Sequence, residues 1–177
     1  MTRKRLERGT VHLFTGNGKG KTTAALGAGL RAAGHGYRVL MVQFMKGRRY
    51  GELAAVKHVA GFEIAQYGLD SFVEKGRPSP EDLRLAREGF QKAFEAVSSG
   101  QYDVVILDEV NVAVDYGLLG LDEVLKLVRT KPQNLELILT GRYAHQKLID
   151  SADTVTEMVE VKHHHGAGVE AREGIEY

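Results

Sequence analysis

A glycine-rich stretch followed by a lysine and two threonines carries the clearest chemistry in this chain. It consists of Gly16, Asn17, Gly18, Lys19, Gly20, Lys21, Thr22 and Thr23. Glycines let successive backbone N–H groups converge on phosphate oxygens, and the N-terminus of a following helix adds a partial positive charge. Lys21 would reach the phosphates as a point charge, and the Thr22 hydroxyl would ligate Mg²⁺. The stretch therefore predicts the phosphate-binding loop of a nucleotide site.

The spacing within this loop departs from the usual one. Four residues ordinarily separate the first glycine from the Gly-Lys-Thr end. Here Thr15 occupies the first-glycine position, and Gly16 follows one residue late. The alternative is a glycine-rich turn with an adventitious Gly-Lys-Thr. We favour the phosphate loop because a strand pattern precedes it, a helix pattern starts at Ala24, and the glycines, lysine and hydroxyl all agree.

Two acids form the second half of a magnesium-nucleotide site. Asp108 and Glu109 directly follow the apolar run from Val104 to Leu107. In phosphate-loop proteins, an acid that ends such a strand holds Mg²⁺ directly or through water. We expect Asp108 and Glu109 to share this role with Thr22, for Mg²⁺ or Mn²⁺. The alternative, that the acids only mark a strand end, is disfavoured by the upstream loop.

Two further features are less specific. Arg142 comes shortly after an apolar run, at the edge where open α/β sheets bind ligands. It is a candidate phosphate partner, with an ordinary surface salt bridge as an equal alternative. His163, His164 and His165 are consecutive, and consecutive strand residues alternate faces, so they cannot all converge on one metal. We expect these histidines to be solvated or to lie at the edge of the nucleotide site.

Six apolar runs of strand length must position these groups. They are Val11 to Phe14, Val39 to Phe44, Phe62 to Ala65, Val104 to Leu107, Leu135 to Leu139 and Val155 to Val161. Several are nearly continuous rather than alternating, as expected for strands covered by helices on both faces.

Helical patterns alternate with these runs. One helix is predicted from the Ser79 cap and Pro80 to Gly100. Its predicted core face consists of Leu83, Ala86, Phe90, Ala93, Phe94 and Val97. A second helix begins near Leu121 and closes at Lys131, and the stretch from Gly68 to Pro80 is a predicted loop. The alternation predicts a three-layer α/β fold with a mainly parallel central sheet.

The bulk properties favour one globular domain over residues 1–177, in which residues 1–8 form a short basic arm. The chain has 24 Lys and Arg, 23 Asp and Glu, and no Cys. The balanced charge gives no field that points to nucleic acid or a membrane surface, and disulfides and thiolate catalysis are excluded. No apolar run approaches the ~20 residues of a membrane span. We expect a cytoplasmic enzyme with small-molecule substrates.

A phosphate loop by itself does not name a reaction. The Asn-Lys-x-Asp motif that reads guanine is missing from the sequence, which favours ATP. Hydrolysis needs a positioned water and usually a base, which Glu109 would supply, whereas phosphoryl transfer needs an acceptor pocket that the sequence does not reveal. Composition and spacing thus lead to a small ATP-using enzyme.

Blocks along nearly the whole chain resemble the P-loop family of ATP:corrinoid adenosyltransferases, which act on cob(I)yrinic acid a,c-diamide or cob(I)alamin. The blocks are Phe14 to Ala25, Gly34 to Gly36, Val42 to Gly47, Leu107 to Glu109, Thr140 to Arg142, Ala152 to Glu157, Val161 to His163 and Gly174 to Tyr177. They follow one another in collinear order. The shortened loop is itself a mark of that family.

The resemblance implies transfer of the 5′-deoxyadenosyl group of ATP to the Co(I) centre of a corrinoid, with release of tripolyphosphate. It also implies a RecA-like fold, a homodimer, an electron donor for Co(II) reduction, and ATP lying along the loop in the opposite sense from ordinary P-loop enzymes. Co(I) is a strong nucleophile and attack at C5′ removes no proton, so no general base is needed. The protein must then align cobalt with C5′ and stabilise charge on the leaving triphosphate, which Lys21, the loop N–H groups and Mg²⁺ can do. The expected catalytic residues are Lys21, Glu109 and Arg142.

The resemblance also suggests where the corrinoid binds. Family members place aromatic side chains beneath the corrin in the loop that matches Gly68 to Phe72, which makes Tyr67 and Phe72 candidates. They also carry a longer N-terminal segment that folds over the corrin, whereas eight residues precede Gly9 here. Two other hypotheses stay open: a RecA-like ATPase or small-molecule kinase, and a nucleotide- or corrinoid-binding carrier without turnover.

Overall fold

Six parallel strands form one central sheet in the computed structural model, which describes residues 5–177. The strands are β1 (Val11–Thr15), β2 (Val39–Phe44), β3 (Phe62–Tyr67), β4 (Val104–Asp108), β5 (Glu136–Thr140) and β6 (Thr154–Glu157). Their order across the sheet is β3-β2-β4-β5-β1-β6. Every neighbouring pair is parallel, so the carboxyl ends of all six strands lie at one edge of the sheet.

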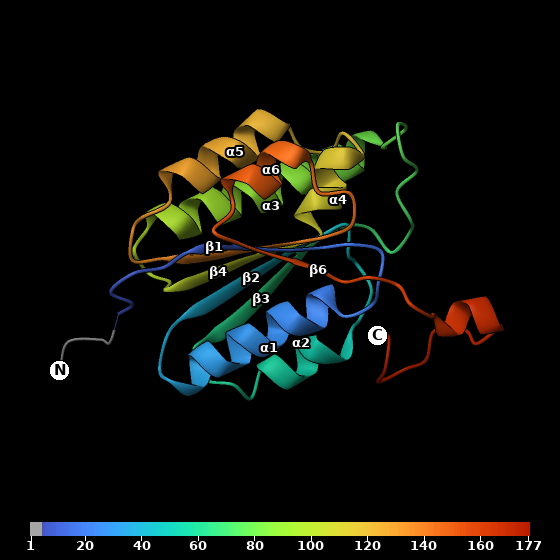
Figure 1. Ribbon diagram of the computed structural model, residues 1–177, viewed down its shortest axis with the longest axis horizontal. Helices are drawn as coiled ribbons and strands as arrows, with labels where there is room; N and C mark the ends of the chain where they lie inside the picture. The colour runs from blue at the N-terminus through green and yellow to red at the C-terminus, as the bar shows by residue number, and fades with distance from the viewer. Residues whose placement is uncertain (1–4) are drawn as a thin grey trace.

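Helices cover both faces of the sheet. They are α1 (Lys21–Gly34), α2 (Gly51–Val56), α3 (Pro80–Ser98), α4 (Val110–Asp115), α5 (Leu121–Thr130), α6 (Gln146–Ser151) and the 3₁₀ turn η1 (His164–Ala167). Figure 1 shows α1 and α2 on one face and α3, α4, α5 and α6 on the other. The predicted three-layer α/β fold is confirmed.

Alternate residues of the central strands enter two separate cores. In β2, Val39 and Met41 pack with α1, whereas Leu40, Val42 and Phe44 pack with the α3 and α5 layer. Successive strand residues point to opposite faces, so a strand covered on both sides is apolar throughout. This arrangement explains the continuous apolar runs of the sequence.

Helix α3 begins as the sequence predicts. The Ser79 hydroxyl accepts a hydrogen bond from the Asp82 amide at 3.1 Å, and the Asp82 carboxylate accepts one from the Ser79 amide at 2.9 Å. The predicted core face is wrong at Phe94, whose side chain is 39% exposed. The buried face is centred on small residues instead, because Gly89 packs so closely on β3 that an added Cβ would lie 2.9 Å from the Tyr67 ring.

The sixth strand is shorter than predicted. It ends at Glu157, and the expected strand residues Val159 and Val161 are exposed. Among residues 5–177, β6 pairs only with β1, and β1 itself ends at Thr15, so within that range no strand remains to pair with the chain beyond Glu157. Of the predicted arm at residues 1–8, residues 1–4 lie outside the described range. The loop between β3 and α3 is confirmed, and over residues 5–177 no helix has the length and apolar character to cross a bilayer.

Candidate nucleotide site

The glycine-rich loop lies at the carboxyl edge of the sheet, between β1 and α1. Gly16 and Gly20 have positive φ angles of 92° and 115°. An added Cβ at Gly16 would lie 2.4 Å from the Met158 carbonyl oxygen, and one at Gly18 would lie 2.7 Å from it. The loop therefore needs glycine for its turn and for the backbone that crosses it after β6.

Helix α1 begins at Lys21, three residues before the predicted start at Ala24. Lys21, Thr22 and Thr23 therefore occupy the first turn, where backbone N–H groups have no acceptor within the helix and are available to an anion. The Gly18 N–H, by contrast, already donates to the Met158 carbonyl at 2.6 Å. The amides free to meet a phosphate thus come from the end of the loop and from the first turn of α1.

The Lys21 side chain is buried beneath the loop. Its ammonium donates to the Gly18 carbonyl at 2.6 Å. Burial lowers the pKa of Lys21, while the charges of Glu109 and Asp108 oppose this effect. Its own loop thus holds Lys21 in place through a neutral carbonyl. An ammonium binds an anionic oxygen more strongly than a neutral carbonyl, so a phosphate oxygen would replace the Gly18 carbonyl as its partner.

Asp108, at the end of β4, is fully buried and bonded at both oxygens. Its Oδ1 accepts from the Thr22 hydroxyl at 2.8 Å and from the Thr140 hydroxyl at 2.7 Å. Its Oδ2 accepts from the Lys46 ammonium at 2.7 Å and from the Gln43 amide at 3.2 Å. The sequence predicted that Asp108 and Thr22 belong to one site, and the structure brings them into contact.

Lys46, Gln43 and Thr140 were not predicted as members of this site. Gln43 is a polar residue in an otherwise apolar strand and lies opposite Asp108 in the β2–β4 register. A buried polar residue in such a strand needs a hydrogen-bond partner. This was the sequence feature that could have identified Gln43 as part of the site. Burial tends to lower the pKa of Lys46, but the adjacent Asp108 charge outweighs it, so the pKa is raised and the ammonium stays charged.

Glu109 adopts a left-handed backbone conformation, with φ 63°, at the start of α4. This conformation is uncommon outside glycine and is often retained at functional sites. Its N–H donates to the Thr140 hydroxyl at 2.9 Å, and its side chain lines the cavity described below. Burial, and then the Asp108 charge, raise the pKa of Glu109, although Lys46, Lys21 and Arg142 oppose the shift.

The oxygen groups of Thr22, Asp108 and Glu109 are hard ligands of the kind that Mg²⁺ prefers. No group of three or more His, Cys, Asp or Glu side chains able to hold a metal occurs within residues 5–177. A divalent cation here therefore needs further oxygens from water or from a phosphate. This donor set fits a metal that arrives with a nucleotide, as in other phosphate-loop sites.

A cavity of about 680 Å³ opens beside the loop. Its walls include the loop from Gly18 to Thr23, the side chains of Lys46, Glu109 and Arg142, and parts of the segment after β6. The structure thus brings the predicted residues Lys21, Thr22, Glu109 and Arg142 to one cavity. Its size suits a ligand as large as a nucleotide.

The two aromatic residues proposed for the corrinoid do not line this cavity. Tyr67 ends β3 and packs against α3, where burial raises the pKa of its hydroxyl. Phe72 is 92% exposed, and the Arg48 guanidinium lies 5.3 Å from its ring centre. Tyr67 therefore packs against the core, whereas the Phe72 ring is exposed and accessible to a large ligand.

The three consecutive histidines lie on no strand, which corrects the basis of the prediction about them. His163 precedes η1, and His164 and His165 form its first residues. All three line the cavity, and the rings of His163 and His164 stack at 4.3 Å. A 3₁₀ turn brings neighbouring side chains to one side more readily than a strand does.

Comparison with known proteins agrees with this geometry. Residues 7–177 match the family model of the ATP:corrinoid adenosyltransferase BtuR/CobO/CobP. The corrinoid adenosyltransferase of Escherichia coli (strain K12) is 41% identical over 173 residues, which cover 97% of this chain and 87% of that protein. The corrinoid adenosyltransferase CobA of Salmonella typhimurium is 39% identical with the same coverage. That of Pseudomonas aeruginosa is 36% identical over 97% of this chain and 85% of its own.

Two solved structures share the fold at low sequence identity. The RadB recombinase has a TM-score of 0.55 and 16% identity, covering 89% of this chain and 78% of its own. A KaiC-like protein from Pyrococcus horikoshii has a TM-score of 0.58 and 20% identity, covering 86% and 73%. These likenesses confirm the RecA-like fold.

Proposed function

The chain belongs to the ATP:corrinoid adenosyltransferase family, and we propose that it transfers the 5′-deoxyadenosyl group of ATP to the Co(I) centre of a corrinoid and releases tripolyphosphate. The observation that carries this proposal is that Glu109 and Arg142 line the same cavity as the phosphate loop with its Lys21. The family relationship supports the substrates, and the loop supports the part of ATP that becomes the leaving group.

The reaction forms a Co–C5′ bond and breaks the bond between C5′ and the 5′ oxygen of ATP. The electron pair of that bond leaves with the triphosphate, so negative charge grows there and no proton moves. Preorganised cations and N–H groups stabilise such charge best where water is excluded. Lys21, Arg142 and the first-turn amides of α1 fill this role. With the triphosphate held by these groups, C5′ is left for the corrinoid to approach.

The resemblance to the family also supports a nucleotide laid along the loop in the opposite sense from ordinary P-loop enzymes, with its γ-phosphate deep in the loop. Such a pose keeps C5′ away from the loop and open to the corrinoid. Thr22, Asp108 and Glu109 would hold the Mg²⁺ of Mg-ATP. When bound, the ion supplies further positive charge to the triphosphate.

We place the corrinoid at the exposed aromatic loop between β3 and α3. The family resemblance supports this loop, and Phe72 offers an unburied apolar ring there. We further propose that two copies of the chain associate and that a separate electron donor reduces Co(II) to Co(I). β6 is an edge strand of the sheet and its one apolar side chain, Val155, is exposed, which is compatible with such an association.

Anaerobic incubation with Mg-ATP and a chemically reduced corrinoid tests the activity. The expected products are a light-sensitive alkyl corrinoid and tripolyphosphate, in equal amounts. Parallel reactions with cob(I)alamin and cob(I)yrinic acid a,c-diamide would identify the preferred acceptor. ADP and inorganic phosphate without any alkylated corrinoid would contradict the proposal.

A second function rests on Glu109. Its side chain lines the cavity and burial raises its pKa, which are properties of a general base. In a RecA-like ATPase or kinase it would orient water or an acceptor hydroxyl. ADP formation that does not depend on corrinoid and is abolished by Glu109→Gln would support this alternative.

A further inference from the structure

The segment of residues 158–177 leaves the sheet after β6 and returns to the phosphate loop. In Figure 1 it is the red stretch that runs outward through η1 and comes back toward α1 and α2. Apart from the η1 turn it has no regular structure. Eight of its residues line the cavity: His163, His164, His165, Ala171, Gly174, Ile175, Glu176 and Tyr177. One wall of the nucleotide cavity is therefore an irregular segment that something must hold in place.

Bonds to the phosphate loop hold this segment near both of its ends. Near its beginning, the Met158 carbonyl accepts from the Gly18 amide at 2.6 Å. Near its end, the Lys19 ammonium lies 2.6 Å from Glu176 Oε1 and 3.5 Å from the Ile175 carbonyl. The Glu176 side chain is 12% exposed and that of Lys19 is 42% exposed. The second attachment is therefore a partly shielded ion pair between the loop and the segment.

Glu176 also organises the segment internally. Its Oε2 accepts from the Arg172 amide at 2.7 Å, and its Oε1 lies 3.1 Å from the Arg172 guanidinium and 3.6 Å from His164 Nε2. The hydrogen bonds from Arg172 and Lys19 hold the pKa of Glu176 far below its ordinary range. The Gly174 amide closes a turn on the Tyr177 carbonyl at 2.7 Å. One carboxylate thus ties the fold of the segment to the loop.

We propose that Glu176 is a positioning residue for the nucleotide, which latches the 158–177 segment over the cavity through Lys19. In this assignment Lys19 serves the latch, whereas Lys21, the first-turn amides of α1 and Arg142 meet the phosphates. Lys19 has two acceptors on the segment, and a phosphate would have to replace both. The latched segment excludes water from the bound nucleotide and slows its release. The assignment depends on the proposed function only in taking ATP as the ligand of the cavity.

A double-mutant cycle separates a latch from direct phosphate binding. The variants are Lys19→Met, Glu176→Gln and the two combined, with Glu173→Gln, an exposed carboxylate on the same segment, as the matched control. ATP affinity is measured by calorimetry. For an ion pair of this exposure we expect each single variant to weaken ATP binding about three- to tenfold. The double variant should be no weaker than the singles, because each change breaks the same contact.

A second readout needs no nucleotide. Trypsin cleavage after Lys162, an exposed residue of the segment, reports how often the segment opens. Both single variants should be cut several-fold faster than the protein with Glu173→Gln, while the melting temperature of the domain stays the same. A Glu176→Asp variant, which keeps the charge, should recover part of the protection.

Three outcomes would overturn the proposal. Additive losses in the double variant, or a loss in Lys19→Met far greater than in Glu176→Gln, would make Lys19 a phosphate ligand. Unchanged ATP affinity and unchanged cleavage in both single variants would remove the latch. If the unmodified protein binds no ATP, the proposed function fails instead, and the cleavage comparison still decides whether the latch exists.

Discussion

The Lys46 ammonium lies 2.7 Å from the buried carboxylate of Asp108. It also lies 3.5 Å from the Thr22 hydroxyl, so it sits beside two of the groups expected to hold a divalent cation, which are themselves hydrogen-bonded to each other. Lys46 thus balances the charge of Asp108 when no metal is present. A metal that binds here must either displace the ammonium or bind beside it together with anionic phosphates, which links metal binding to nucleotide binding.

Removal of the Lys46 charge should destabilise the fold. In Lys46→Met, the fully buried Asp108 loses its cation, and breaking one side of a buried pair typically costs about 3–5 kcal/mol in the free energy of unfolding. Urea unfolding at neutral pH measures the change. The control is Lys46→Met with Asp108→Asn, which removes both charges and should recover much of the loss. A single variant as stable as the original chain would contradict the assigned role.

Lys21→Ala and Glu109→Ala should each suppress adenosyl transfer. Lys21→Ala removes a cation that stabilises the leaving triphosphate, and Glu109→Ala removes a proposed ligand of the Mg²⁺ that supplies further positive charge there. Loss of one preorganised group of this kind typically lowers kcat roughly 10²- to 10³-fold. The initial rate of alkyl-corrinoid formation under saturating Mg-ATP is the measurement.

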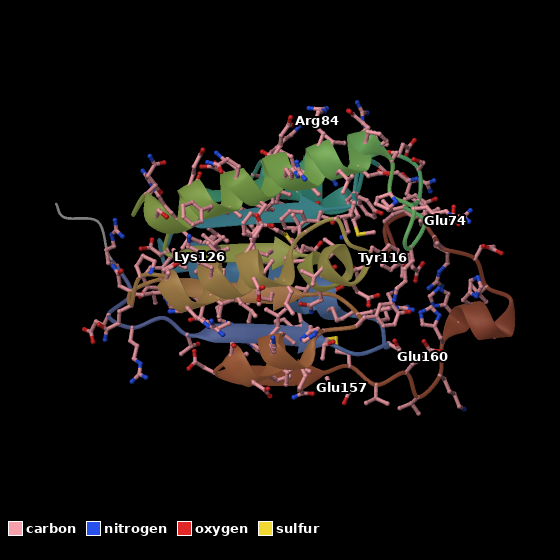
Figure 2. The ribbon with its side chains drawn as sticks, turned by 90° about the horizontal axis from the view of Figure 1, so that it is seen from above. Glu74, Arg84, Tyr116, Lys126, Glu157 and Glu160 are labelled. Carbon is pink, nitrogen blue, oxygen red and sulfur yellow. The ribbon has the colours of Figure 1, made fainter. Side chains whose placement is uncertain are left out.

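The control for these variants is Lys126→Ala, at an exposed position of α5. Figure 2 labels Lys126 at the end of the molecule opposite to Glu74 and Tyr116, which lie toward the 158–177 segment. This change should leave the rate as it is. Turnover retained in either Lys21→Ala or Glu109→Ala would refute the role of that residue.

Two glycine-to-alanine changes should have opposite effects. At Gly16 the backbone has φ 92° and an added Cβ would lie 2.4 Å from the Met158 carbonyl. We expect Gly16→Ala to cost at least about 2 kcal/mol of unfolding free energy and to abolish ATP binding.

At Gly27, within α1, an added Cβ meets nothing within 4 Å. Gly27→Ala should stabilise the chain by about 1 kcal/mol, the difference in helix propensity between the two residues. Thermal unfolding of both variants under the same buffer conditions tests this pair. Equal effects of the two changes would show that the close approach of Met158 is unimportant.

Stability should decline in mildly acidic solution because of His12. Burial lowers the pKa of His12 below its ordinary 6.5, although the charge of Glu136 partly opposes this. The unfolded chain therefore takes up the proton first as the pH falls through about 6.5, and the free energy of unfolding decreases from there down to the folded-state pKa. Above pH 7.5 both states are neutral at this residue, and the contribution is constant.

The variant His12→Gln removes this titration. It keeps a polar group that can bond the Thr156 hydroxyl, which lies 3.0 Å from His12 Nε2. Urea unfolding at pH 7.5 and pH 5.5 should show a smaller loss in the variant than in the original chain. Identical losses would mean that His12 does not contribute to the acid sensitivity.

The amino-acid sequence determined much of the fold and the centre of the site. Apolar runs and helix signals are local, so they identified the six strands and helix α3 with errors at their ends, the largest at β6. Parallel strands share one carboxyl edge, so residues that follow different strands meet there. This reasoning correctly joined Thr22 to Asp108 and placed Lys21, Glu109 and Arg142 at one cavity.

The tertiary structure determined the contacts between distant residues, which leave no periodic pattern in the sequence. The register of β2 against β4 brings Gln43 opposite Asp108, and the turn after β2 delivers Lys46 to the same carboxylate. The path of the 158–177 segment depends on contacts with a loop about 140 residues earlier, as in the pair of Lys19 and Glu176, which are separated by 157 positions. Local propensity carries no information about such distant pairs, because their free energy depends on where the whole sheet places the two segments.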